Sequence, residues 1–323
     1  MNFMDQLDPE IRVILEAMPT GGSVDLNNIP AARAKMRKLV TTMQAKLPAI
    51  EGVTSQDLSV PGRQGDPAVR VRVYQPNDRP RLLPSLLWIH GGGYVMGDIE
   101  QDDRLMKQLV TRVGCVAVSV DYRLPPEHPF PAPVEDCYAG LTWLFAHAGE
   151  LGVDLSRIAI GGASAGGGLA AGLALLARDR KEVRVAFQLL IYPMIDDRNV
   201  TPASYTITDP RVWHRESNRL GWKAYLGREG GGDNVSPYAA ATRATDLTHL
   251  PPAYIPVGAL DLFIDENIEY AQRLIQAGVP TELHVYPGAI HGFDMFAPSA
   301  AVSKQFKAER DNALKRALHP SSR

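Results

Sequence analysis

The chain has 323 residues, and its 34 Lys and Arg residues nearly balance 36 Asp and Glu residues, which gives a formal net charge of −2. Hydrophobic residues make up 45% and charged residues 22% of the chain, so a disordered or fibrous protein is excluded. The near-zero charge and the lack of a basic cluster argue against nucleic acid as the main partner.

Three features bear on cofactors and location. Cys115 and Cys137 have no metal-ligand spacing and are too few for a disulfide framework. Residues 1–10 carry acidic side chains and no apolar core of a signal peptide. No apolar run approaches the length of a membrane span. We therefore expect a cytoplasmic protein with no membrane span, no metal and no organic cofactor.

The first fifty residues are expected to be helical. Asp8-Pro9-Glu10 is a typical helix start, because proline suits the first turn and acidic side chains favour the positive end of the dipole. A second, amphipathic helix that ends before Pro48 is indicated by apolar residues at helical spacing, namely Met36, Leu39, Val40, Met43 and Leu47. We assign residues 1–50 to a separate N-terminal helical segment.

Strand and helix patterns alternate after this segment. Strands are expected at 69–73, 86–89, 115–120, 158–160, 186–191, 253–257 and 281–286. Helices are expected near 105–113, 134–147, 165–177, 265–276 and 299–318. Since several of these strands are continuous apolar runs, the pattern predicts the α/β class, with a mostly parallel sheet and helices on both faces.

One long stretch interrupts the alternation. Tyr192 to Pro252 contains no convincing strand over about sixty residues, and a connection of that length is usually a lid or an inserted subdomain. We therefore predict one α/β domain over residues 51–323, with a lid or inserted subdomain at about residues 196–235.

The strongest local motif is Gly162-x-Ser164-x-Gly166, which lies between a predicted strand and a predicted helix. It is typical of a nucleophile elbow, a strained turn whose neighbours at −2 and +2 must lack side chains. A phosphate-binding glycine loop or a tight structural turn is the alternative. No Gly-Lys-Ser/Thr follows, and the dinucleotide-like match Gly166-x-Gly168-x-x-Ala171 starts inside the predicted helix, so a nucleotide site is disfavoured.

A second glycine motif precedes the first. His90-Gly91-Gly92-Gly93 follows directly after the predicted strand 86–89. Consecutive glycines can aim backbone N–H groups into one small space, as the developing negative charge of acyl transfer requires. A merely flexible loop is the alternative, but this position upstream of the elbow is that of the oxyanion loop of lipases and esterases.

A general base is expected among the eight histidines. His291 lies in a glycine-containing loop directly after the predicted strand 281–286. In a parallel sheet this loop lies at the same carboxyl edge as Ser164. Although loop histidines are more often structural, this placement favours His291 as the base.

An acidic partner for the histidine is expected after another strand. Asp261 follows the predicted strand 253–257, whereas Asp265 and Glu266 fit better in the first turn of the next helix. The resulting chain order of serine, aspartate and histidine is that of α/β-hydrolases.

Together these residues resemble the hormone-sensitive-lipase-type carboxylesterases, bacterial family IV of the α/β-hydrolase fold. The resemblance runs from about residue 50 to the C-terminus and lies in His90 to Asp98, Asp121 to Leu124, Pro126 to Ala132, Glu135-Asp136, Gly162 to Gly167, Tyr192-Pro193, Asp261 to Glu266 and His291 to Phe293. It implies a mostly parallel central sheet with a helical cap. The N-terminal helical cap segment would be residues 1–50, and the catalytic domain 51–323 would carry a second cap insertion at about residues 196–235.

The resemblance also implies roles. Ser164 would be the nucleophile, His291 the base and Asp261 its partner. The oxyanion hole would consist of the backbone amides of Gly92, Gly93 and Ala165. The sequence departs from the family pattern at Ala163, where Asp or Thr is usual, and at Leu262, where Pro is frequent.

The function predicted from these motifs is hydrolysis of short- to medium-chain carboxylic esters through an acyl-enzyme. A non-catalytic small-molecule receptor on the same fold is the alternative from another class, and His291 argues against it. Hydrolysis of amides, thioesters or lactones remains open, because these reactions share the tetrahedral intermediate. The strand 281–286, expected last in the sheet, offers an edge that can pair with its copy in a homodimer.

Overall fold

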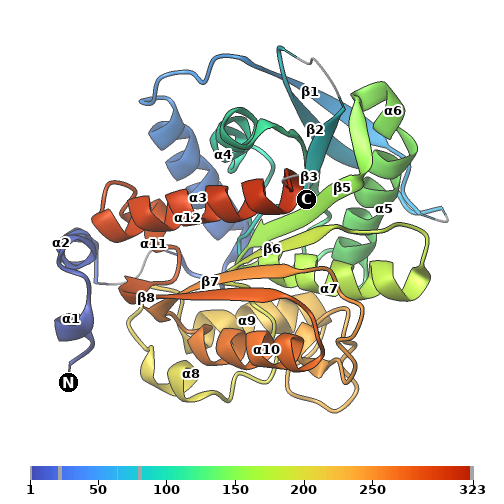
Figure 1. Ribbon diagram of the computed structural model, residues 1–323. Helices are drawn as coiled ribbons and strands as arrows, with labels where there is room; N and C mark the ends of the chain where they lie inside the picture. The colour runs from blue at the N-terminus through green and yellow to red at the C-terminus, as the bar shows by residue number, and fades with distance from the viewer. Residues whose placement is uncertain (1, 21–23, 64, 79–81, 321–323) are drawn as a thin grey trace.

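The computed structural model describes residues 2–20, 24–63, 65–78 and 82–320. Within these residues the chain forms one eight-stranded sheet in the order β1-β2-β4-β3-β5-β6-β7-β8 (Figure 1). The strands are β1 (Val53–Val60), β2 (Val69–Pro76), β3 (Leu83–Ile89), β4 (Val116–Asp121), β5 (Val153–Ala163), β6 (Phe187–Ile191), β7 (Ala253–Leu260) and β8 (Thr281–Ile290).

The sheet is mostly parallel, as predicted. Strand β2 pairs antiparallel with both β1 and β4, and the pairs from β4 through β3, β5, β6 and β7 to β8 are all parallel. All of β6 and nearly all of β3 and β4 are buried, because helices cover both faces of the sheet. The predicted α/β-hydrolase fold is confirmed.

Strand β1 was not predicted. Its side chains from Thr54 to Asp57 are polar and exposed, because this strand lies at the edge of the sheet. An edge strand that faces water lacks the apolar alternation by which strands are recognised in a sequence.

Helices lie on both sides of the sheet, with α4 and α12 on one side and α7 and α10 on the other (Figure 1). The helices are α1 (Phe3–Gln6), α2 (Pro9–Ala17), α3 (Ile29–Gln44), α4 (Asp103–Leu109), α5 (Ala132–Ala146), α6 (Ala148–Leu151), α7 (Ala165–Arg180), α8 (Pro202–Thr206), α9 (Arg215–Leu226), α10 (Ile264–Gln276), α11 (Phe293–Phe296) and α12 (Ala301–Leu318). Each predicted helix is present, although the one expected near 105–113 changes into a π-helical turn after Leu109.

Helix α3 lies on the surface. Its predicted apolar side is largely open to water, because Leu39 and Met43 are each about half exposed and Ala32 alone is buried. Polar contacts attach the helix instead: Arg33 donates to the backbone oxygen of Val95 at 2.7 Å and pairs with Glu127.

The long connection between β6 and β7 contains no strand in the described residues, as predicted. It carries α8 and α9, and it touches the N-terminal segment, since Arg211 donates to the backbone oxygen of Leu15 at 3.0 Å. Strand β8 is the last strand of the sheet and extends to Ile290, four residues beyond its predicted end. Homodimer formation through this edge stays a prediction. In the described chain no helix combines the length and apolarity needed to cross a membrane.

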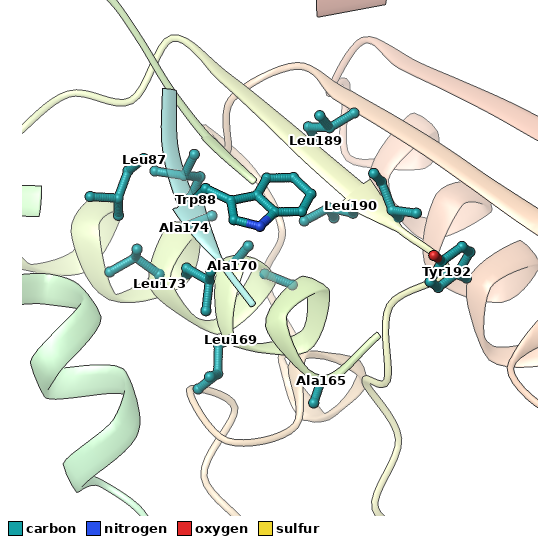
Figure 2. Close-up of a cluster of buried hydrophobic side chains, with 14 of the residues drawn as sticks. Leu87, Trp88, Ala165, Leu169, Ala170, Leu173, Ala174, Leu189, Leu190 and Tyr192 are labelled. Carbon is teal, nitrogen blue, oxygen red and sulfur yellow. The ribbon is translucent and has the colours of Figure 1, made fainter. Parts of the chain in front are cut away.

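Helix α7 anchors the centre of the fold. Its residues from Ala165 to Ala177 are all buried, and its small and leucine side chains pack against those of β3 and β6 (Figure 2). This packing holds the N-terminus of α7 against the sheet.

We expect Leu173→Ala to lower the free energy of unfolding by about 2–5 kcal/mol, because it leaves a cavity between α7 and the sheet. Leu155→Ala, at a half-exposed position of β5, should cost less than about 0.5 kcal/mol. Equilibrium urea unfolding measures both values. Equal losses for the two variants would contradict the role assigned to this packing.

Candidate active site

Ser164 stands in a sharp turn between β5 and α7. Its φ of 56° and ψ of −121° lie outside the regions that a side chain favours. Three backbone hydrogen bonds hold it there: its N–H donates to Ile191 at 2.9 Å, and its oxygen accepts from Gly168 at 2.9 Å and Met194 at 3.0 Å. Strain of this kind costs about 1–3 kcal/mol and persists only where the surroundings fix it.

The two glycines of the motif are required by close backbone contacts. A Cβ on Gly162 would lie 2.3 Å from the backbone oxygen of Gly166, and a Cβ on Gly166 would lie 2.1 Å from that of Ile89. Neither position has room for a side chain, so the turn can pass this close to β3 only with glycine on both sides of Ser164.

The structure brings Ser164, His291 and Asp261 together. Oγ of Ser164 lies 2.9 Å from Nε2 of His291, and Nδ1 of His291 lies 2.8 Å from Oδ2 of Asp261. Asp261 follows the last residue of β7 and His291 the last residue of β8, so parallel pairing carries both side chains to one edge of the sheet. Asp261 is fully buried, and its Oδ1 accepts from the N–H of Phe263 at 2.9 Å.

Two aromatic rings for which the sequence predicted no role hold the imidazole of His291. Tyr192 and Phe263 both meet it edge to face, with ring centroids 4.9 Å away. The hydroxyl of Tyr192 donates to Asp294 at 2.8 Å, and burial raises the pKa of Tyr192 well above its ordinary value. Both residues lie within motifs that carry the family resemblance, Tyr192-Pro193 and Asp261 to Glu266, but no local pattern indicates that their rings converge on one histidine.

The glycine loop after β3 has free donors. Gly92 and Gly93 have φ values of 126° and 60°, and among the described residues none accepts a hydrogen bond from their N–H groups. Ala165 is the first residue of α7, where the N–H has no partner within the helix. Three amides that a bound carbonyl oxygen can use are therefore available beside Ser164.

A buried histidine supports this loop from behind. The ring of His90 stacks on that of Tyr122 with centroids 4.2 Å apart, and its Nδ1 donates to the backbone oxygen of Gly91 at 2.9 Å. The hydroxyl of Tyr122 donates to the backbone oxygen of His90 at 3.1 Å. These contacts fix the start of the loop in one conformation.

The two acidic residues set aside as helix-terminal do lie in the first turn of α10, and they also anchor the insertion. Buried Glu266 accepts from the N–H groups of Ile195 at 2.9 Å and Asp196 at 3.3 Å, and burial raises its pKa well above the ordinary value. Asp265 accepts from the N–H of Ala203 at 2.7 Å. Sequence reasoning recognised the helix start but missed these distant partners.

The described residues contain no cluster of three or more His, Cys, Asp or Glu side chains arranged to hold a metal ion. Cys115 and Cys137 are both free and buried, and burial raises the pKa of Cys115 to about 12. Both cysteines therefore belong to the packing of the core.

Known proteins resemble the chain over nearly its full length. It is 34% identical to esterase LipI of Mycobacterium tuberculosis, covering 97% of this chain and 96% of that protein. It is also 34% identical to carboxylesterase NlhH of the same species, over 97% of both chains.

Solved structures of esterases resemble the chain in both fold and sequence. A bacterial heroin esterase superimposes with a TM-score of 0.94 at 46% identity, over 98% of this chain and all of that one. An esterase from Pyrobaculum calidifontis gives a TM-score of 0.87 at 35% identity, over 96% of this chain and 98% of the other. A family model described as the alpha/beta hydrolase fold (Abhydrolase_3) matches residues 86–295.

The family model, the relatives and the solved structures all point to one family. The chain therefore belongs to the Abhydrolase_3 family of the α/β-hydrolase fold, in the hormone-sensitive-lipase-like group that its paired glycine motifs resemble.

Proposed function

We propose that this protein is a carboxylesterase that hydrolyses short- to medium-chain esters through an acyl-enzyme on Ser164. The observation that carries the proposal is the continuous contact from Ser164 through His291 to buried Asp261. Its full-length relatives are named esterases and carboxylesterases, which supports the same reaction class.

The first step is acylation. Asp261 accepts a hydrogen bond from Nδ1–H of His291, which leaves Nε2 free to take the proton of the Ser164 hydroxyl. Oγ of Ser164 then attacks the ester carbonyl carbon and forms a tetrahedral intermediate. As this collapses, Nε2–H of His291 protonates the leaving alkoxide, and the alcohol departs.

The negative charge of the intermediate requires fixed donors. The amides of Gly92, Gly93 and Ala165 would bind the oxyanion, and they need no reorganisation because the loop and the helix start are already set. The positive end of the dipole of α7 adds to the same stabilisation.

The second step repeats the first with water. His291 removes a proton from a water molecule, whose oxygen attacks the acyl carbon. The intermediate then collapses, Ser164 regains its proton from His291, and the carboxylic acid leaves.

We infer that residues 1–50 and about 196–235 form a cap over this site, with residues 1 and 21–23 outside the described part of the chain. Ser164 is only 9% exposed, which fits a covered nucleophile. Contact between the two segments supports a common cap, because Arg211 of the insertion bonds to the backbone of Leu15.

Replacing Ser164 by Ala should abolish hydrolysis of p-nitrophenyl butyrate and labelling by a fluorophosphonate, because the hydroxyl that contacts His291 forms the covalent bond in both reactions. Exposed Ser55→Ala on β1 is the matched control and should keep both. Turnover and mass spectrometry check these results. A wild-type chain that neither labels nor hydrolyses esters would favour the receptor alternative, and p-nitrophenyl butyrate activity retained by Ser164→Ala would remove Ser164 from the mechanism.

Asp261→Asn should lower kcat by about 10⁴-fold, because an amide in place of the carboxylate favours the wrong tautomer of His291. Steady-state kinetics on p-nitrophenyl butyrate measure the loss. Asp233→Asn, an exposed position of the insertion, serves as control and should change little. If Asp261→Asn kept wild-type kcat in a folded protein, another group would have to orient the histidine.

A further inference from the structure

We propose, on the basis of the proposed ester hydrolysis at Ser164, that Trp213 is a specificity-determining residue that limits the size of the groups attached to the ester carbonyl. Trp213 lies in the insertion, in the loop before α9. No motif singled it out, since its place beside the glycine loop arises only in the folded chain.

The indole of Trp213 lies directly against the glycine loop. A Cβ on Gly93 would be 2.2 Å from Cη2 of Trp213 and 3.0 Å from both Cζ2 and Cζ3. The six-membered part of the ring therefore covers the α-carbon of Gly93. Only glycine at this position lets the ring approach so closely.

This contact places the indole beside the reacting group. A carbonyl oxygen bound by the N–H of Gly93 would lie about 3 Å from that nitrogen. The two substituents of the carbonyl carbon then extend past the same residue, and we infer that one of them runs along the face or edge of Trp213. The ring therefore acts as a wall of the substrate pocket.

Hydrogen bonds hold the ring in this position. Nε1 of Trp213 donates to Oδ1 of Asn218 at 3.2 Å, and Nδ2 of Asn218 donates to Oδ1 of Asn199 at 3.1 Å. Nδ2 of Asn199 donates in turn to the backbone oxygen of Arg215 at 3.1 Å. Because both asparagines are buried, breaking this series would leave polar groups unpaired, so the ring has one preferred orientation.

Apolar packing closes the remaining space around the ring. Trp213 packs against a small cluster that joins the N-terminal segment to the glycine loop, made up of Leu26, Ala32, Val95 and Met96. On another side it meets α9, where a Cβ on Gly221 would lie 3.5 Å from Cζ2 of Trp213. A bulky substrate group cannot push the ring aside without separating these elements.

Such a wall predicts selectivity by size. An apolar pocket distinguishes substrates that differ by one methylene by about 10- to 200-fold. A residue that only supported the fold would instead affect all esters alike. The ratio of kcat/KM for a bulky and a small ester therefore separates the two roles.

The experiment compares two pairs of esters in wild type and Trp213→Ala. p-Nitrophenyl pivalate against p-nitrophenyl acetate tests the acyl side, and tert-butyl acetate against ethyl acetate tests the alcohol side. We expect the bulky-to-small ratio of kcat/KM to rise about tenfold or more in one pair, and the pair that responds identifies the side that Trp213 limits. Unchanged ratios in both pairs would overturn the proposal.

Further variants distinguish loss of the Trp213 ring from a general loss of structure. Trp213→Phe keeps an aromatic ring of smaller size and should shift the same ratio in the same direction by less. Asn218→Leu removes the acceptor of the indole N–H and should also shift it, since Asn218 is a positioning residue for Trp213. Trp143→Ala on α5, whose ring stacks on His147 with centroids 4.8 Å apart, is the matched control and should leave both ratios unchanged.

Failure of this proposal is distinguishable from failure of the proposed function. If Ser164→Ala abolishes the hydrolysis of p-nitrophenyl acetate that the wild type shows, but Trp213→Ala leaves both ratios unchanged, the specificity role alone is contradicted. Wild type without Ser164-dependent hydrolysis contradicts the esterase function itself.

Discussion

The strained backbone of Ser164 is the constraint on which the rest of the site depends. A residue with a φ of 56° can persist only if neighbouring chain segments hold it, and here β6 and the segment after it supply the hydrogen bonds. The same turn needs side-chain-free neighbours, because the backbone of β3 passes within contact distance of Gly166. Three adjacent parallel strands, β3, β5 and β6, thus cooperate to present one hydroxyl, and the buried residues of α7 beneath them keep the helix start in place (Figure 2).

The glycine loop depends on a second set of contacts, made on both of its sides. Behind it, the rings of His90 and Tyr122 stack, and each side chain donates a hydrogen bond to a backbone oxygen of the loop. In front, the insertion covers it, since the ring of Tyr94 stacks on Tyr225 of α9 with centroids 4.0 Å apart and Trp213 covers Gly93. The insertion therefore packs directly against the glycine loop. A substitution in α9 that moves Tyr225 would disturb the loop that carries the proposed oxyanion donors.

Polar contacts attach the N-terminal segment to the remainder of the molecule in several places. The N–H of Asp8 donates to the backbone of Gly288 at 3.0 Å, Glu10 accepts from the N–H of Ala301 at 2.7 Å, and Arg33 binds the backbone of Val95. The exposed apolar side chains of α3 add little burial. Apolar packing anchors the first part of the segment as well, since Leu7, Ile11 and Leu15 are buried in the main hydrophobic core.

The sequence by itself determined the sheet class, the position of the nucleophile turn and the two strands after which Asp261 and His291 come. These features depend on neighbours in the chain: buried strands are apolar runs, a strained turn needs glycine two residues away, and parallel strands end at one edge. Only the tertiary structure decided which distant groups complete the site. Several contacts join segments far apart in the chain: the pairing of the polar edge strand β1, the rings of Tyr192 and Phe263 around His291, the hydrogen bond from Ile195 to Glu266, and the contact of Trp213 with Gly93. Such contacts follow from packing and burial across the whole fold, and they leave no periodic or local pattern in the sequence.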